Sequence, residues 1–118
     1  MDRLQYILLA LGIFVALYLL RRMAGGPLVS GEEAKTLVAD GATLVDVRSP
    51  GEFASGHVKG AINIPVQEFS ARSKEIPKDK PVVLYCASGM RSGAAAGMLR
   101  SAGRTDVHNL GSISRWPG

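Results

Sequence analysis

One stretch of this chain restricts its fold more than any other: a short apolar run at 82–85, then a cysteine, a small polar loop and many small residues. The apolar run is partly β-branched, which is typical of a strand buried on both faces of a parallel sheet. The small residues of 92–102, followed by Gly103, predict a helix. Gly93 and Gly97 weaken an isolated helix, so we expect them to allow its close approach to the sheet. Strand, loop and helix together indicate an α/β fold.

The cysteine of this stretch, Cys86, stands at the carboxyl end of the expected strand. Ligands of open α/β sheets bind outside such ends, and a helix that begins there directs its unpaired N–H groups into the loop. These groups and the nearby cation of Arg91 favour a thiolate. Ser88 and Gly89 allow a tight backbone curl whose amides bind an anion. We therefore predict a reactive cysteine in an anion-binding loop rather than a buried structural thiol.

The chain before and after this stretch alternates short apolar runs with helical segments, as α/β proteins do. Ser30 and Glu33 fit a capping box at the start of a helix that ends at 40–41. The other expected strands are 43–47, 61–64 and 106–110, and the other expected helices are 66–73, with Phe69 inward, and 112–116, with Trp116 over the core. The pattern predicts a central, mostly parallel sheet.

Charged residues follow the first expected strand, where the catalytic face should be. Asp46 and Arg48 stand at its end, and Glu52 follows four residues after Arg48. Charges near a buried strand end need partners, so we expect an ion-pair network that fixes the loop, with direct substrate contact as the alternative. His57, in an expected turn, is interpreted as a loop hydrogen-bonder, and so is His108. No second histidine or carboxylate has the spacing of metal ligands, so no metal site is predicted.

The N-terminal segment 4–20 is almost entirely apolar and is flanked by Arg3 on one side and by Arg21 and Arg22 on the other. As a helix it reaches roughly 25 Å, the short end of what spans a bilayer. Its apolar character on all sides argues against a soluble amphipathic helix. We expect an uncleaved membrane anchor. A secretory signal peptide is one alternative, although arginines stand where small residues should precede cleavage, and a buried soluble helix is another.

The expected organisation is a transmembrane helix with its flanking charges in 1–22, a linker at 23–27 and one domain at 28–118. One positive side chain precedes the apolar segment and two follow it, so the domain is expected in the cytoplasm, or exported if 1–22 is a signal peptide. The single cysteine rules out an intrachain disulfide. The net charge of +4 comes partly from the arginines beside the apolar segment, and no basic stripe interleaved with aromatics supports nucleic-acid binding.

The loop 86–92, Cys-Ala-Ser-Gly-Met-Arg-Ser, resembles the active-site loop of single-domain rhodaneses, the thiosulfate-type sulfurtransferases. Two further stretches agree with it. The segment 44–65, with Leu-Val-Asp-Val-Arg and Gly-His-Val-Lys-Gly-Ala-Ile-Asn-Ile-Pro, is similar to the family's N-terminal signature, and 109–116 is similar to its C-terminal one. The match covers about 28–116. It implies a rhodanese-like three-layer domain, preceded here by one transmembrane helix.

The resemblance implies a double displacement through a persulfide on Cys86, which takes sulfur from a donor such as thiosulfate and passes it to a thiol or cyanide acceptor. The residues implied to bind the anionic substrate are Ala87, Ser88, Gly89, Met90 and Arg91. The residues implied to support this loop are Asp46, Arg48, Glu52 and His57. The implied partners are a small anionic sulfur donor, a small or protein thiol acceptor and, through the N-terminal helix, the membrane. No metal or organic cofactor is called for.

Two other functions stay open on the sequence. Cysteine-based phosphatases and arsenate reductases also pair a cysteine with an arginine, but over five intervening residues, where this chain has four. A membrane-tethered binding module without turnover is the other alternative. Two departures from the family pattern, Ser112 in place of a second glycine and the lack of a short tail after Gly118, are expected to lie far from the thiol and to affect stability rather than chemistry.

Overall fold

The computed structural model describes residues 1–23 and 26–118, so the expected linker 23–27 includes two residues, 24 and 25, that lie outside the described ones. The helices are α1 (Arg3–Met23), α2 (Gly31–Ala39), α3 (Pro50–Ser55), α4 (Phe69–Arg72) and α5 (Met90–Ser101). The strands are β1 (Thr43–Asp46), β2 (Ile62–Asn63), β3 (Val82–Cys86) and β4 (Val107–Ser112). The described residues also form three short 3-10 turns, η1 (Val66–Glu68), η2 (Ser73–Glu75) and η3 (Ile113–Arg115).

The four strands form one sheet in the order β2-β1-β3-β4, and every pair in it is parallel. After β1 the chain crosses to one edge of the sheet, and after β3 it crosses to the other. The carboxyl ends of β1 and β3 therefore lie side by side at the point where the direction of winding changes. Ligands of open α/β sheets bind at such a point. The predicted α/β architecture with a parallel sheet is confirmed.

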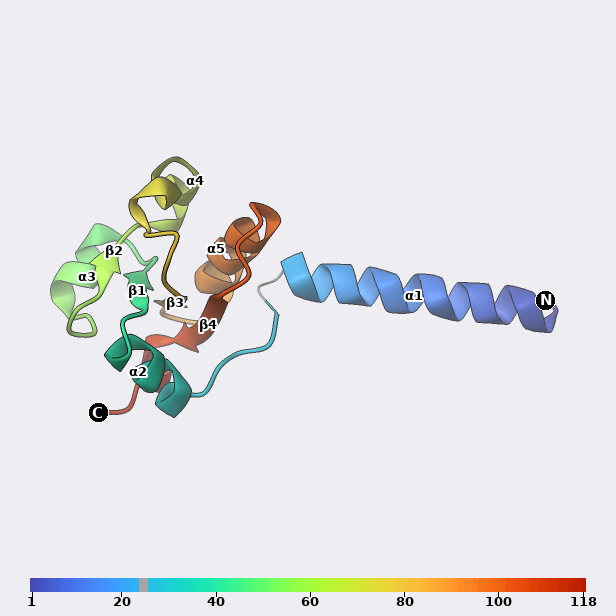
Figure 1. The fold of residues 1–118 in the computed structure, drawn as a ribbon, viewed down its shortest axis with the longest axis horizontal. Helices are drawn as coiled ribbons and strands as arrows, with labels where there is room; N and C mark the ends of the chain where they lie inside the picture. The colour runs from blue at the N-terminus through green and yellow to red at the C-terminus, as the bar shows by residue number, and fades with distance from the viewer. Residues whose placement is uncertain (24–25) are drawn as a thin grey trace.

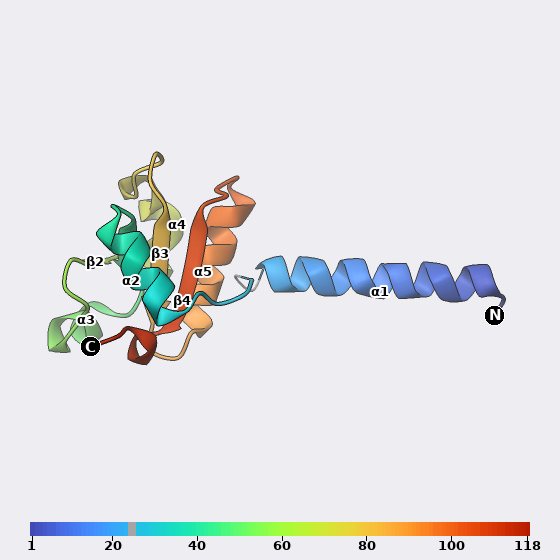
Figure 2. The same cartoon turned by 60° about the horizontal axis from the view of Figure 1, so that its bottom comes forward.

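Helices cover both faces of the sheet, which makes three layers (Figures 1 and 2). Alternate residues of β3 enter two separate cores because successive side chains of a strand point to opposite faces. Leu84 and Cys86 pack with residues of α4 and α5, including Phe69 and Leu99. Tyr85, on the opposite face, packs in the second core, which also takes in residues of α2 and η3 and the partly buried Trp116.

Serine residues cap the starts of two helices, α2 and α3, by hydrogen bonds to main-chain N–H groups. Ser30 caps α2 and accepts the N–H of Glu33 at 3.1 Å, but the carboxylate of Glu33 accepts from the Ser30 hydroxyl instead of its N–H. The expected capping box is therefore only half formed. The complete box lies at α3, where Ser49 and Glu52 exchange both bonds and Pro50 takes the first helical position.

The central helix, α5, begins two residues earlier than the sequence predicts. Gly89 precedes it in the left-handed region, with φ 103°, so the helix begins at Met90. Gly93 and Gly97 are buried where α5 packs on β3 and β4. The second strand is shorter than expected, because β2 pairs with β1 only through Ile62 and Asn63.

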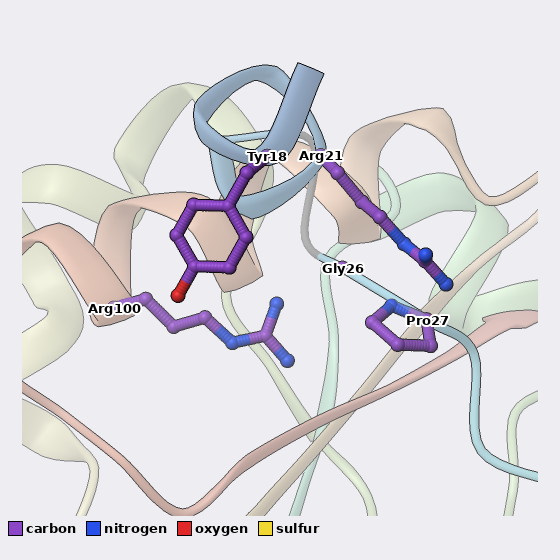
Figure 3. A pocket seen from close by; sticks show the side chains of 5 residues that line it. All are labelled: Tyr18, Arg21, Gly26, Pro27 and Arg100. Carbon is purple, nitrogen blue, oxygen red and sulfur yellow. The ribbon is translucent and has the colours of Figure 1, made fainter. Parts of the chain in front are cut away.

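The apolar helix α1 projects away from the three layers (Figures 1 and 2), and none of its apolar stretch is buried by the rest of the described chain. Its end approaches α5, where Tyr18 and Arg21 face Arg100 across a pocket (Figure 3). By length and composition it is the one described helix able to cross a membrane.

Candidate active site

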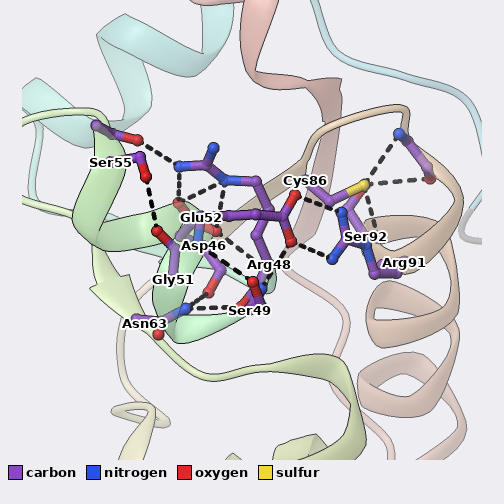
Figure 4. Close-up of polar contacts among 12 residues, drawn as sticks. Asp46, Arg48, Ser49, Gly51, Glu52, Ser55, Asn63, Cys86, Arg91 and Ser92 are labelled. Atoms are coloured by element: carbon purple, nitrogen blue, oxygen red, sulfur yellow. Dashed lines mark hydrogen bonds and ion pairs between the residues drawn. The ribbon is translucent and has the colours of Figure 1, made fainter.

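The thiol of Cys86 lies at the end of β3, fully buried, with hydrogen-bond donors directed at its sulfur (Figure 4). The N–H groups of Gly89 and Ser92 lie 2.9 Å and 3.4 Å from Sγ. Both donors result from the way α5 begins. The positive φ of Gly89 turns its own N–H back toward the strand, and the N–H of Ser92, in the first helical turn, has no partner within the helix.

These hydrogen bonds decide the ionisation of the thiol. Burial is the largest single influence on Cys86 and opposes a thiolate, but the hydroxyl of Ser92 and the N–H groups of Ser92, Gly89 and Ser88 together outweigh it. The pKa of Cys86 is therefore lowered from its ordinary value. Arg91, which the sequence analysis named beside the N–H groups, is not among these donors.

The hydroxyl of Ser92 is placed to respond to the charge of the sulfur. It lies 3.5 Å from Sγ of Cys86, 3.2 Å from the carbonyl oxygen of Gly89 and 3.5 Å from that of Gly111. A hydroxyl carries one proton and two lone pairs. It accepts from the neutral thiol while donating to a carbonyl, and it donates to the sulfur once that becomes a thiolate.

The loop arginine, Arg91, is held by an acidic residue from another element. Its Nη1 and Nη2 atoms donate to the two carboxylate oxygens of Glu52, at 2.7 Å and 3.0 Å. The hydrogen bond from Arg91 and the one from the Ser49 N–H lower the pKa of Glu52 to about 2. The guanidinium, which the sequence predicts to favour the thiolate, is fixed beside the loop, and its charge acts on the sulfur from a distance.

Asp46 and Arg48 form a second, separate ion pair. The buried carboxylate of Asp46 accepts two bonds from Nε of Arg48, at 3.1 Å and 3.0 Å, and one from Nη2, at 2.8 Å. Nη2 also donates to the carbonyl oxygen of Gly56. The single ion-pair network expected for Asp46, Arg48 and Glu52 is therefore two separate clusters. The Glu52 carboxylate takes part in the capping box of α3 and pairs with Arg91 rather than with Arg48.

Further polar side chains tie the neighbouring loops to these clusters. The amide of Asn63 donates to the carbonyl oxygens of Asp46 and Arg48, at 3.0 Å and 2.9 Å. The hydroxyl of Tyr85 accepts the N–H of Val58 at 3.1 Å, and burial raises the pKa of this tyrosine to about 12. The phenol therefore stays neutral in the physiological range.

His57 lies outside the reacting centre. Its Nδ1 atom is 2.8 Å from the carbonyl oxygen of Phe53, and its ring stacks on the Phe53 ring at 3.6 Å between centroids. Both contacts fit the expected loop role. His108 pairs with Asp106 at 2.7 Å, well separated in sequence from the cysteine loop.

Ser112 corrects an expectation, since it is not far from the thiol. It pairs with Cys86 across β3 and β4, after a register shift between Leu84 and Tyr85. A Cβ atom on Gly89 would lie 3.5 Å from Cα of Gly111, so the segment before Ser112 forms the wall behind the loop. The Ser112 side chain itself turns to η3, where it accepts the N–H of Ser114.

The remaining predicted loop residues frame the sulfur rather than contact it through side chains. Ala87 and Ser88 are exposed, and Met90 is 82% exposed. Within the described part of the chain, no group of three or more histidine, cysteine or acidic residues is placed to hold a metal ion.

Three residues of the site were missed on the sequence: Ser92, Ser49 and Asn63. Ser92 offered a signal, since a serine six residues after the cysteine falls in the first turn of the following helix. Ser49 also offered one, because Ser-Pro with Glu52 three residues after the serine is a capping-box pattern. Asn63 offered none, because its partners are main-chain groups of a different strand and loop.

Comparisons with known proteins agree with this geometry. The model of the rhodanese-like domain matches residues 30–117. The uncharacterized protein YqhL of Bacillus subtilis is 50% identical over 78 residues, which cover 65% of this chain and 62% of that protein. The thiosulfate:glutathione sulfurtransferase of Homo sapiens is 39% identical over 110 residues, with 80% of this chain and 96% of that protein covered.

The solved structure of the human single-domain sulfurtransferase TSTD1 superposes with a TM-score of 0.66 at 36% identity, covering 77% of this chain and 95% of that one. The chain therefore belongs to the rhodanese-like family. Relatives that are named sulfurtransferases are 35–45% identical to it, so it is a rhodanese-type sulfurtransferase domain.

Proposed function

We propose that this protein transfers sulfane sulfur through a persulfide on Cys86. The observation that carries this proposal is the buried sulfur with two main-chain N–H groups directed at it, which favours an anion at that atom. The Cys86 thiolate attacks the outer sulfur of the donor and forms a new S–S bond. The old S–S bond breaks, and its electron pair leaves with sulfite when the donor is thiosulfate. An acceptor thiolate then takes the outer sulfur and regenerates the Cys86 thiolate.

The donor and acceptor classes are inferred from the relatives. The human relative is named for thiosulfate and glutathione, which supports an anionic sulfur donor and a thiol acceptor for this chain. The fixed cation of Arg91 beside the loop favours an anionic donor. The N–H groups of Gly89 and Ser92 hold the sulfur, while Ala87, Ser88 and Met90 form the exposed rim.

The side chains behind the loop act as its scaffold in this proposal. Glu52 holds Arg91, and the pair of Asp46 and Arg48 ties β1 to the chain near His57.

A sulfite-release assay tests this proposal. The full chain is supplied with thiosulfate and with cyanide or a dithiol as acceptor. We expect release of sulfite by the wild type and only background release by Cys86→Ser, because a hydroxyl replaces the nucleophile. Ser88→Ala is the matched control, since it removes an exposed hydroxyl of the same loop and leaves the amide in place. Equal activity of Cys86→Ser and wild type would refute the proposal.

We also propose that α1 crosses the membrane once and holds domain 28–118, through the linker 23–27, on the cytoplasmic side. Its exposed apolar surface supports the crossing, and the two arginines at the end of the apolar stretch, against one before it, support this orientation. A signal sequence has the same appearance, so the test must include the mass of the mature chain. We expect the mature protein to keep residues 1–22 and to float with lipid vesicles. A mature protein that lacks 1–22 would contradict the anchor.

A further inference from the structure

A hollow, apart from the cysteine loop, lies where α1 meets α5. A pocket of about 420 Å³ is lined by Tyr18 and Arg21 of α1, Gly26 and Pro27 of the following segment, and Arg100 of α5. Figure 3 shows the tyrosine ring and both arginine side chains around this hollow. The described residues that line it bring two guanidinium groups and no carboxylate. Such a lining is complementary to an anion.

The two residues from α1 lie at the level where a membrane-spanning helix leaves the hydrocarbon. Tyr18 and Arg21 are three positions apart, so they share one face of the helix. They stand at the carboxyl end of the apolar segment. Tyrosine and arginine at such a position lie among lipid headgroups, the tyrosine through its amphipathic ring and the arginine through its long side chain.

Arg100 completes the pocket from the catalytic domain. Its Nη2 atom donates to the carbonyl oxygen of Val107 at 2.8 Å, which fixes the end of the side chain. A guanidinium stays protonated in proteins, so Arg100 brings a permanent positive charge to the pocket. Gly26 allows the close approach of this group, because a Cβ atom there would lie 3.0 Å from Nη1 of Arg100.

We propose that this pocket binds the phosphate group of an anionic phospholipid. An arginine can bind phosphate through two parallel, charge-assisted hydrogen bonds. Cations next to a bilayer are also attracted to its anionic lipids. The inference rests on the proposed membrane role of α1, whose apolar surface brings the pocket to the headgroups. A soluble phosphate ester offers the same charge but makes no use of the adjoining apolar helix.

The bound headgroup would also orient the domain. Gly26 lines a second hollow, which it shares with Leu28 and with Ser88 and Met90 of the cysteine loop. A lipid in the first pocket would therefore fix the mouth of the sulfur-transfer site close to the membrane surface. A membrane-bound acceptor would meet the persulfide there at raised effective concentration.

A lipid titration of the full chain in detergent, read by native mass spectrometry, tests the site. The probes are phosphatidylglycerol and phosphatidylcholine with the same acyl chains. We expect the wild type to retain phosphatidylglycerol preferentially, and Arg21→Gln and Arg100→Gln each to weaken that retention about fivefold. Arg21 is exposed on α1, so its variant should fold even if loss of the Val107 bond disturbs Arg100→Gln. Lys78→Gln, with the same charge loss on an exposed turn, should retain the lipid like the wild type.

Four results would overturn the proposal: equal retention of the two lipids, unchanged retention by Arg21→Gln, an equal loss in Lys78→Gln, or displacement of the lipid by glycerol 3-phosphate at equal concentration. The last result would assign the pocket to a soluble phosphate ester. Flotation with phosphatidylcholine vesicles separates this question from the anchor. Failure to float contradicts the anchor and the lipid site together. Normal flotation contradicts the lipid site alone if Arg21→Gln and Arg100→Gln retain the lipid as well as the wild type does.

Discussion

Ser92 sets the protonation of Cys86 by a local contact, because its hydroxyl and its N–H both reach the sulfur. Ser92→Ala removes the hydroxyl and keeps the N–H. A hydrogen bond to a charged group contributes about 1.5–3 kcal/mol, so we expect sulfur transfer to fall roughly tenfold at pH 6 and to recover at high pH. A pH profile of kcat/KM measures this, with Ser88→Ala as the control. A uniform loss at every pH would assign Ser92 a structural role instead.

Glu52 links the pH dependence of folding to its contact with Arg91. The hydrogen bond from Arg91 lowers the pKa of Glu52 from 4.5 to about 2 in the folded chain. A depressed carboxyl pKa stabilises the fold above the unfolded value, and this stabilisation is lost as the pH falls through the folded value. We expect the difference in urea midpoint between wild type and Glu52→Gln to be largest above pH 4.5 and to vanish near pH 2.

The comparison of Glu52→Gln with wild type isolates this one group, since all other carboxylates are common to both chains. Glu32→Gln, on the exposed surface of α2, serves as the control for the loss of a negative charge. A stability difference that stays constant from neutral pH to pH 2 would contradict the assignment.

Contacts of the site between residues that are close in sequence could be predicted, and contacts between residues far apart in sequence could not. The N–H of Gly89 reaches a sulfur three residues away, so the loop motif alone predicts an anion-binding curl. The partner of Arg91 lies 39 residues away on α3, and no pattern near the arginine identifies it. The nearness of Ser112 to Cys86 depends on the register of β3 and β4, which the sequence does not specify.

At the scale of elements, the loop between β3 and α5 depends on one backbone conformation. Gly89 has φ 103°, where a side chain is strained, so we expect Gly89→Ala to destabilise the fold by roughly 1–2 kcal/mol. The N–H of residue 89 would also turn from the sulfur and slow the alkylation of Cys86. Urea unfolding and the rate of reaction with iodoacetamide measure the two effects.

Gly51→Ala is the matched control for this substitution. Gly51 lies in α3 without a positive φ, and a Cβ atom there meets nothing within 4 Å. Alanine should therefore stabilise this helix by roughly 0.5–1 kcal/mol and leave the thiol unchanged. The prediction for Gly89 fails if both alanine variants have the same stability and the same alkylation rate.

Most elements were predictable from periodicity and caps, but α3 was not expected, and the expected helices 66–73 and 112–116 are formed partly or wholly by 3-10 turns. The ends of other elements were missed as well. The helix start at Met90 was missed because Gly89 takes the N-cap position without a side-chain cap. The second strand was predicted too long because its pairing stops at Asn63, whose side chain turns back to main-chain carbonyls after β1. Both ends are set by backbone geometry and long-range pairing rather than by local residue preference.

At the scale of the whole molecule, the sulfur-transfer site and the apolar helix are built from separate parts of the chain. The residues around Cys86 come from the sheet, α3 and α5, whereas the Arg3–Arg21 stretch of α1 is not buried. We expect a chain beginning at Leu28 to keep kcat/KM for thiosulfate within about twofold and to lose vesicle flotation, since distant sites act independently. A loss of turnover beyond tenfold in this folded domain would show that α1 contributes to the site.

In the proposed reaction Cys86 carries the transferred sulfur, and intact-mass spectrometry of the full chain detects that sulfur on the protein. After thiosulfate is added, we expect a gain of about 32 Da, one sulfur atom, as for a covalent intermediate on a nucleophilic thiol. The added mass should disappear with a dithiol and be absent from Cys86→Ser. A folded wild-type chain that gains no mass, or a Cys86→Ser chain that gains as much, would contradict it.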